Sequence, residues 1–255
     1  MTTTIAVAGK GGVGKTTFIA MLIQYIRSRE LGVVLAIDGD PAANLNMVLG
    51  MQLPETVGRI REDTRTEVTT GRYDTSIPKA DFFEYRINES LIEGDRVDLI
   101  AMGRPEGPGC YCAANSILRN VIDRLGNGYD YVVIDNEAGL EHISRQTTRD
   151  VDKLFILTDM TMRGVATAGH IAGLITELGT RMHETYLVIN RASSEVPPTM
   201  RQEIDKLGLN LVGTLPEDPL VAEFDMSGKP LIEIGEDSPS FRAVAAIAEK
   251  AGIKK

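Results

Sequence analysis

The sequence predicts an α/β fold built on a doubly wound, mostly parallel sheet of about seven strands flanked by helices. Two observations support this fold class. Short apolar runs alternate along the chain with stretches of helical spacing, which is the pattern of successive strand–helix–strand units. A glycine-rich turn also joins the first apolar run to the first helical stretch. A chain of 255 residues suits one substantial α/β domain, so we expect a single domain over 1–255.

The predicted strands are the apolar runs, each of which we expect to be buried on both faces of the sheet. In order they are 5–9, 33–38, 97–102, 131–135, 153–158, 185–190 and 211–215. Helices are expected between them, with a last helix near 241–251. The interval of about 52–95 is polar with scattered charges, and we expect a helix or two packed on one edge of the sheet there. We assign no chemistry to this insertion.

The turn after the first strand fits the phosphate-binding pattern G-x-x-x-x-G-K-[ST] at every fixed position. Its glycines let backbone N–H groups turn inward around a phosphate, and the following helix adds its positive N-terminal end. A glycine-rich turn that fits by chance is disfavoured by the strand before it and the helix after it. We therefore expect a nucleoside triphosphate with Mg²⁺, bound by Gly11, Gly12, Val13, Gly14, Lys15, Thr16 and Thr17.

Three side chains of this loop have distinct expected roles. Lys15 is expected on the β- and γ-phosphates, and the Thr16 hydroxyl is expected to ligate Mg²⁺. The hydroxyl and amide of Thr17 are expected to reach the α-phosphate. These residues predict a nucleoside triphosphate site, and the family resemblance described below implies that the nucleotide is ATP or ADP.

Lys10 narrows the class of nucleotide-binding protein. The run Lys-Gly-Gly-Val-Gly-Lys-Thr-Thr at 10–17 resembles the deviant phosphate loop of the MinD/ParA group, which are P-loop NTPases of the SIMIBI type. The resemblance implies an ATPase that forms a homodimer around its nucleotides, with Lys10 reaching the phosphates of the partner. From the residues alone, the tip of Lys10 either points into solvent or pairs with phosphate charge.

The second predicted strand ends in Asp38-Gly39-Asp40-Pro41. Carboxylates at the C-terminal end of a strand lie on the side where open α/β sheets bind ligands. The resemblance implies that Asp40 orients or activates the water that attacks the γ-phosphate. Asp38 either helps to hold the Mg²⁺ water shell or caps a turn.

The fourth predicted strand, Tyr-Val-Val-Ile-Asp at 131–135, is a Walker B pattern whose Asp135 is expected to face the Mg²⁺ water shell. Gly139 follows four residues later, and its backbone amide is expected to sense the γ-phosphate as part of a switch. Glu137, between them, either tunes the attacking water or faces solvent.

Two strand ends are candidates for the base pocket. The resemblance implies that Asn190 hydrogen-bonds the adenine edge while the stem of Arg191 packs on the ring. It also implies that the loop containing Pro216 forms the second adenine-side wall. From the residues alone, both segments could equally be ordinary strand-to-helix loops.

The chain has only two cysteines, Cys110 and Cys112, in the run Gly-Pro-Gly-Cys-Tyr-Cys. Two cysteines placed at random in a chain of this length would stand two apart only about once in a hundred arrangements. A disulfide over one intervening residue is strained and disfavoured in a reducing compartment, whereas packing in the core is disfavoured by the Gly-Pro-Gly lead-in. Two thiolates are too few for a closed metal site, but a dimer supplies four.

Together with Ala-Gly-Leu-Glu-His at 138–142, these motifs resemble the CooC group of ATPases, which insert nickel during maturation of carbon monoxide dehydrogenase, and their counterpart for acetyl-CoA synthase. The resemblance covers nearly the whole chain except 52–95. It implies an ATP-hydrolysing metallochaperone in which Cys110 and Cys112 of both protomers bind Ni²⁺ or Zn²⁺ at the dimer axis. The alternatives are a MinD/ParA-type positioning ATPase and an iron–sulfur carrier or reductase ATPase.

Composition argues against two classes of partner. A formal net charge of −9 disfavours general affinity for nucleic acid, which depends on basic patches. No run approaches the length of a membrane-spanning helix, and the C-terminal helical stretch has mostly alanine at its apolar positions, which makes a poor membrane anchor. The N-terminal residues lack the features of a signal peptide. We therefore expect a cytoplasmic protein that binds neither nucleic acid nor membrane.

Overall fold

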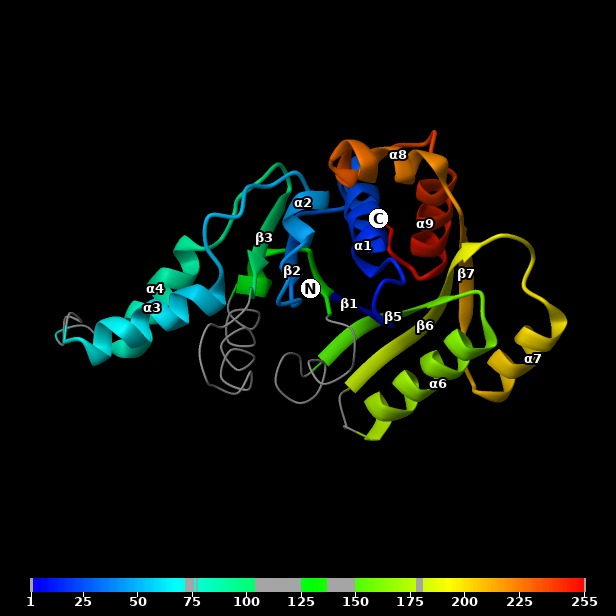
Figure 1. Cartoon of the computed structure of the whole chain (residues 1–255), viewed down its shortest axis with the longest axis horizontal. Helices are drawn as coiled ribbons and strands as arrows, with labels where there is room; N and C mark the ends of the chain where they lie inside the picture. Colours follow the sequence, from blue (N-terminus) through cyan, green and yellow to red (C-terminus); the bar gives the residue numbers. More distant parts are fainter. Residues whose placement is uncertain are drawn as a thin grey trace.

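A computed structural model describes residues 2–71, 76, 78–103, 125–136, 150–177 and 181–254. Seven strands form one sheet in the order β3-β2-β4-β1-β5-β6-β7 (Figure 1). Every neighbouring pair of these strands runs parallel. The predicted fold class, a doubly wound parallel sheet of about seven strands, is therefore confirmed.

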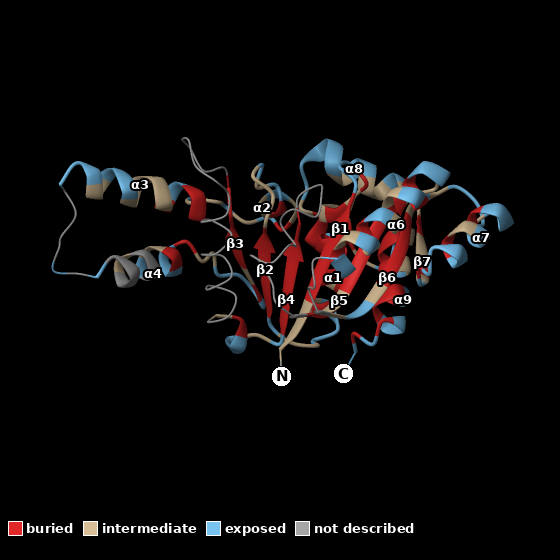
Figure 2. Ribbon diagram, turned by 90° about the horizontal axis from the view of Figure 1, so that it is seen from below, coloured by how far each residue is buried: buried red, intermediate tan, exposed pale blue. Residues whose placement is uncertain are grey.

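Each of the seven predicted strands is present, and the central strands are buried along most of their length (Figure 2). Strands β5 and β6 begin earlier than the apolar runs at 153 and 185, and their first residues, Asp150 and Arg181, stand opposite each other in the register. Lys153 stands opposite Glu184 in the register, and the two side chains form a salt bridge. The strands are β1 (Thr3–Gly9), β2 (Val34–Asp38), β3 (Val97–Ala101), β4 (Tyr131–Asp135), β5 (Asp150–Asp159), β6 (Arg181–Ala192) and β7 (Leu211–Pro216).

Helices cover both faces of the sheet and bury two apolar clusters against it. One cluster joins the sheet to α1 and α9, and the other joins it to α6 and the start of α3. In the first cluster, the ring of Phe155 lies 5.3 Å from that of Phe18 and 5.4 Å from that of Tyr186. The helices are α1 (Lys15–Ser28), α2 (Leu45–Val48), α3 (Val57–Thr69), α4 (Lys79–Glu89), α6 (Met162–Glu177), α7 (Pro198–Lys206), α8 (Pro219–Ser227) and α9 (Pro239–Lys250), with 3₁₀ turns η1 (Gly126–Gly128) and η2 (Leu231–Glu233).

The insertion at about 52–95 contains helices α3 and α4, which lie side by side and extend away from the β3 edge of the sheet (Figures 1 and 2). Among the described residues, the inner ends of both helices are the parts that contact the sheet. The amide of Gly58 donates to the carbonyl of Met102 at 2.8 Å, and the side chains of Val57, Ile60 and Ile87 are buried. The outer turn of α3 is polar and more exposed, so the pair forms an arm rather than a layer over the sheet.

Among the described residues, no helix combines the length and the apolar content that crossing a membrane requires.

Candidate functional site

The glycine-rich turn forms a tight loop between β1 and α1 at the C-terminal edge of the sheet. Gly14 has φ 95°, and a Cβ added there would lie 2.3 Å from Nδ2 of Asn190. A Cβ added to Gly9 would lie 2.4 Å from the carbonyl oxygen of Leu157. Only glycine fits at these two positions, so the loop can approach its neighbours closely and keep its backbone amides available for an anion.

Lys15 carries a buried ammonium group in this loop. It is 8% exposed, and its Nζ donates to the carbonyl oxygen of Gly9 at 3.3 Å. Within the part of the chain that the structure describes, it has no ion pair with a carboxylate. Because a buried cation without a counter-ion is unfavourable, the position suits a phosphate group that supplies the missing charge. The role of Lys15 on the β- and γ-phosphates stays a prediction.

Thr16 and Asp135 are brought together by the pairing of β1 with β4. The Thr16 hydroxyl donates to Oδ2 of Asp135 at 2.6 Å. In the described ranges, no group of three or more His, Cys, Asp or Glu side chains is arranged to hold a metal ion by itself. A hydroxyl beside a carboxylate nevertheless fits Mg²⁺, which takes one or two protein ligands and completes its shell with phosphates and water.

Two buried carboxylates face each other across neighbouring strands, since Asp38 of β2 stands opposite Asp135 of β4 in the register. Burial raises the pKa of Asp135 to about 7; the charge of Asp38 adds to this, and the hydrogen bond from Thr16 and the charge of Lys15 oppose it. Burial also raises the pKa of Asp38 to about 6, against hydrogen bonds from backbone amides. A bound cation would therefore stabilise the ionised forms of both carboxylates.

Asp38 caps the loop that follows β2. Its Oδ1 accepts from the amide of Asp40 at 3.0 Å, and its Oδ2 accepts from the amide of Leu45 at 2.8 Å. Of the two roles expected for Asp38, the turn cap is the one its contacts match. Asp40 is half-buried and accepts from the amide of Ala42 through Oδ1, whereas its Oδ2 accepts no hydrogen bond from a described residue. That oxygen is available to a water molecule.

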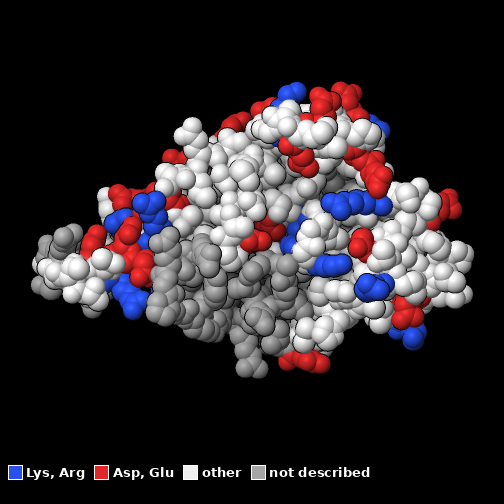
Figure 3. Space-filling view, viewed as in Figure 1, with Lys and Arg blue, Asp and Glu red and all other residues white. Residues whose placement is uncertain are grey.

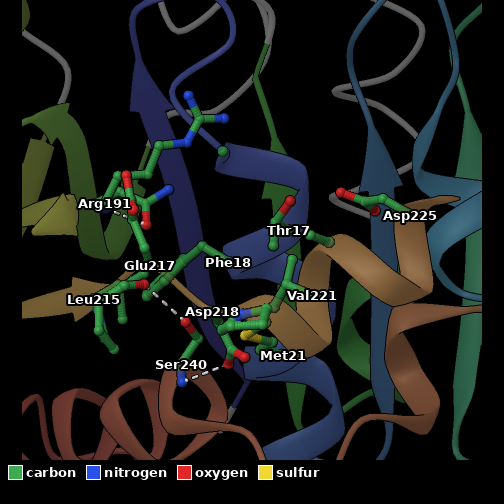
Figure 4. Close-up of a pocket in the computed structure, with 15 residues that line it drawn as sticks. Thr17, Phe18, Met21, Arg191, Leu215, Glu217, Asp218, Val221, Asp225 and Ser240 are labelled. Atoms are coloured by element: carbon green, nitrogen blue, oxygen red, sulfur yellow. Dashed lines mark hydrogen bonds between the residues drawn. The ribbon is translucent and has the colours of Figure 1, made fainter. Parts of the chain in front are cut away.

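A cavity of about 620 Å³ opens beside the phosphate loop, between α1, the ends of β6 and β7, and α8 (Figure 4). Its lining brings together the four residues expected near the α-phosphate and base, which are Thr17, Asn190, Arg191 and Pro216, with the apolar side chains of Phe18 and Met21. The size and the mixed lining suit the base and sugar of a nucleotide.

Asn190 makes a contact that the sequence did not predict. Its Nδ2 donates to the carbonyl oxygen of Val13 at 2.7 Å, and its Oδ1 accepts from the amide of Arg191 at 2.8 Å. The side chain therefore ties the end of β6 to the phosphate loop. An amide oxygen has two lone pairs, so Oδ1 can still accept from the amino group of adenine. Arg191 has φ 53°, at an irregularity in the β6–β7 pairing that places it at the cavity.

Asp218 also makes hydrogen bonds that the sequence did not predict. It accepts hydrogen bonds from the Ser238 hydroxyl at 2.5 Å, from the Ser240 amide at 2.9 Å and from the Leu220 amide at 2.9 Å. Burial raises the pKa of Asp218, but these hydrogen bonds outweigh it and hold the pKa below its ordinary value. The Ser240 hydroxyl donates to the carbonyl of Pro216 at 3.1 Å, which locks the cavity wall (Figure 4).

A local signal for this lock exists in the sequence. Asp218-Pro219 and Ser238-Pro239 are both an N-cap residue followed by proline, which marks the start of a helix. That the two helix starts meet at one carboxylate depends on the fold and cannot be read from either segment alone.

The remaining predicted residues divide into two groups. Lys10 is exposed at the start of the phosphate loop, where either of its expected roles is open to it. Cys110, Cys112, Glu137 and Gly139 lie outside the described residues, so the metal pair and the second switch stay predictions.

A glycine cradle after a central strand, a buried lysine beside it and an adjoining cavity define a P-loop nucleotide-binding protein. Residues 4–231 match the family described as the CobQ/CobB/MinD/ParA nucleotide binding domain. The chain belongs to this family.

Two relatives match over almost their whole length. An uncharacterized ATP-binding protein of Methanocaldococcus jannaschii is 43% identical over 251 residues, covering 98% of this chain and 99% of that protein. The carbon monoxide dehydrogenase accessory protein CooC of Rhodospirillum rubrum is 31% identical over 268 residues, covering 97% of each. The crystal structure of the cell division ATPase MinD of Pyrococcus furiosus has the same fold, with a TM-score of 0.72, 24% identity and 99% coverage of both chains.

The raised pKa of Asp135 makes the stability of the nucleotide-free protein depend on pH. Its folded pKa of about 7 lies above its ordinary value of 3.8, so the stability linked to its proton is fully present below about pH 4 and is lost as the pH rises through 7. We expect Asp135→Asn to remove this loss, of which the two pKa units between pH 5 and pH 7 account for at most about 3 kcal/mol at 1.36 kcal/mol per unit. Urea unfolding at pH 5 and pH 8 in the presence of a chelator measures it.

The control for this measurement is Asp237→Asn, which changes an exposed carboxylate and should leave the pH dependence as in the wild type. An Asp135→Asn protein that loses as much stability between pH 5 and pH 8 as the wild type would contradict the assignment of this buried charge.

Proposed function

We propose that this chain is an ATP-hydrolysing metallochaperone that acts as a homodimer, binds Ni²⁺ or Zn²⁺ through Cys110 and Cys112, and inserts nickel into carbon monoxide dehydrogenase or acetyl-CoA synthase. The observation that carries the proposal is the Cys-x-Cys pair, the only cysteines of a chain that aligns over 97% of its length with CooC of R. rubrum. The nucleotide site described above supplies the ATPase half of this function.

The residues at the phosphate loop fit Mg-ATP. Lys15 would meet the β- and γ-phosphates, the Thr16 hydroxyl would ligate Mg²⁺, and Asp135 would accept from a water of the Mg²⁺ shell. When bound, Mg²⁺ neutralises charge on the phosphates. Asp40 would position the attacking water through its available Oδ2, and Lys10 would meet the phosphates of the second protomer. Asn190 accepts from the adenine amino group through Oδ1, opposite the wall formed by Pro216.

The metal half of the proposal rests on ligand count and chain order. Two thiolates from each of two protomers make the four-sulfur set that suits Ni²⁺ and Zn²⁺ alike. The chain enters 104–124, which contains both cysteines, from the C-terminal end of β3. That end lies at the same edge of the sheet as Asp38 and Asp135. Metal and nucleotide therefore bind to segments that leave one edge, which allows closure of the dimer to affect both.

The family that the chain resembles also includes positioning ATPases and iron–sulfur carriers. For a positioning ATPase, the support is the fold shared with MinD, and a sequence identity of 24% carries no inference about function. The composition of the chain also favours neither the basic surface nor the apolar tail that such an ATPase needs to bind DNA or membrane. An iron–sulfur carrier would also use cysteines at a dimer axis, but its cluster contains iron and sulfide. Elemental analysis of the purified dimer separates these readings.

Lys15→Ala should reduce ATP hydrolysis by at least about 100-fold, because it removes a preorganised cation from the phosphates. The variant should fold as well as the wild type, since the lost ammonium group is buried without a counter-ion among the described residues. Steady-state phosphate release measures the rate, and thermal melting checks the fold. Lys206→Ala, an exposed lysine on α7, is the control. Turnover near the wild-type rate in Lys15→Ala would contradict the assignment of Lys15 to the phosphate site.

Replacing both Cys110 and Cys112 with serine should abolish Ni²⁺ and Zn²⁺ binding, while nucleotide affinity stays within about twofold of the wild type. The wild type should bind one ion per dimer, because four thiolates complete one site. Binding should release protons and weaken as the pH falls, since thiols must ionise to ligate the metal. Equilibrium dialysis read by elemental analysis decides the stoichiometry. One ion per monomer, or full binding in the double variant, would end the metallochaperone proposal.

A further inference from the structure

The arm formed by α3 and α4 is hydrogen-bonded to the outer edge of β3 at two places. The amide of Gly58, at the start of α3, donates to the carbonyl oxygen of Met102 at 2.8 Å. After α4, Ile92 and Leu99 exchange two backbone hydrogen bonds, of 2.9 and 2.8 Å. Figure 3 shows basic and acidic side chains mixed over the described part of the arm, at the left of the view. The arm is therefore attached firmly to β3, the strand that leads to the cysteine segment, 104–124.

Gly103 follows β3 directly and lies against the base of the arm. Its φ is 62°, in the left-handed region that favours glycine. A Cβ added there would lie 2.4 Å from Oγ1 and 2.5 Å from Cβ of Thr56. Thr56 is itself fixed as the N-cap of α3, because its Oγ1 accepts from the amide of Arg59 at 3.3 Å. The contact of Thr56 with Gly103, which we call the anchor, therefore leaves no room for a side chain at 103.

The anchor stands at the entrance to the cysteine segment. Cys110 comes seven positions after Gly103. Seven residues of extended chain span at most about 25 Å, so the point where the chain leaves the anchor limits where the thiols can lie. A metal site shared by two protomers needs four sulfurs at once, and a fixed starting point lowers the entropy that is lost when they come together.

The anchor is also close to the nucleotide site along the hydrogen bonds of the sheet. The amide of Met102, the residue before Gly103, donates to the carbonyl oxygen of Asp38 at 2.8 Å. The carboxylate of Asp38 accepts from the amides of Asp40 and Leu45, and Asp40 is the residue expected beside the attacking water. Met102 is buried, with 4% of its surface exposed. The loop after β2 and the start of the cysteine segment are therefore joined through one buried residue.

We propose that the anchor transmits the nucleotide state to Cys110 and Cys112, which makes Thr56 and Gly103 positioning residues for the metal pair. A shift of the loop held by Asp38 moves the end of β3, and the cysteine segment follows because the chain at the anchor is too closely packed to slide. The inference rests on the proposed function, for which it names the route between the two ligands.

The test is the rate at which iodoacetamide alkylates the metal-free protein with and without Mg-ATPγS, a slowly hydrolysed analogue, followed by mass spectrometry. Cys110 and Cys112 are the only cysteines of the chain, so the reagent reports on this pair. We expect the nucleotide to slow the reaction of the wild type at least about fivefold, because closure of the dimer covers the thiols. In Gly103→Ala, whose added Cβ forces Thr56 away, the nucleotide should change the rate less than about twofold.

Substitutions of Thr56 test the same contact without a clash. Thr56→Gly removes the side chain that packs on Gly103, and glycine is tolerated as an N-cap, so the variant should fold while its thiols lose their response to the nucleotide. Thr56→Ser keeps the hydroxyl cap and the atoms nearest to Gly103, so it should respond as the wild type does. A general loss of structure would not separate these two variants.

Gly208→Ala is the matched control. Gly208 has φ 67°, so alanine meets the same backbone strain there as at Gly103, but a Cβ added to Gly208 has no neighbouring atom within 4 Å. This variant should keep the wild-type response. The affinity for ATPγS should stay within about twofold of the wild type in all four variants, because none of the changed residues lines the base cavity or belongs to the phosphate loop.

Three results would overturn the inference: a wild-type response in Gly103→Ala or Thr56→Gly, an equal loss of response in Gly208→Ala, and wild-type thiols that react equally fast with and without the nucleotide. The proposed function is decided separately, by dialysis with Ni²⁺ and Zn²⁺. Thiols that respond to the nucleotide through the anchor, in a protein that binds neither metal, would end the proposed function and support the route.

Discussion

A buried ammonium group without a carboxylate partner among the described residues is the feature on which the rest of the site depends. Lys15 reaches only the carbonyl oxygen of Gly9, and burial of a cation in this way is unfavourable until an anion arrives. Across the neighbouring strands, burial raises the pKa values of Asp38 and Asp135, so that half of the site favours a bound cation. A buried cation beside two buried carboxylates is suited to a magnesium–phosphate ligand. The sheet, the glycine loop and the helix α1 hold them there.

Much of the fold could be predicted because a parallel sheet covered on both faces has strands that are apolar throughout. All seven strands were found this way, including β2 and β4, which end at the site. The early starts of β5 and β6 were missed because the charged residues Asp150, Asp152 and Arg181 interrupt the apolar pattern at these ends. The arm formed by α3 and α4 gave a weak signal for a similar reason, since only Val57, Ile60 and Ile87 of the described residues in these helices are buried hydrophobics.

The phosphate loop could be predicted in detail because its geometry is encoded locally, by glycines at fixed spacing before Lys15. Contacts that join distant segments could not be predicted from the sequence. The hydrogen bond from Asn190 to Val13 spans 177 positions, and the hydrogen bond from Ser240 to Asp218 spans 22. No local sequence pattern predicts either of them.

The central claim is that one dimer couples the nucleotide site to a thiolate pair, and the affinity for Ni²⁺ with and without Mg-ATPγS tests it most directly. Coupling between two sites is reciprocal, so the nucleotide must change the dissociation constant of the metal by the same factor by which the metal changes that of the nucleotide. We predict a factor of at least about ten in both directions, measured by equilibrium dialysis. A dissociation constant for Ni²⁺ that is the same with and without the nucleotide would contradict the claim.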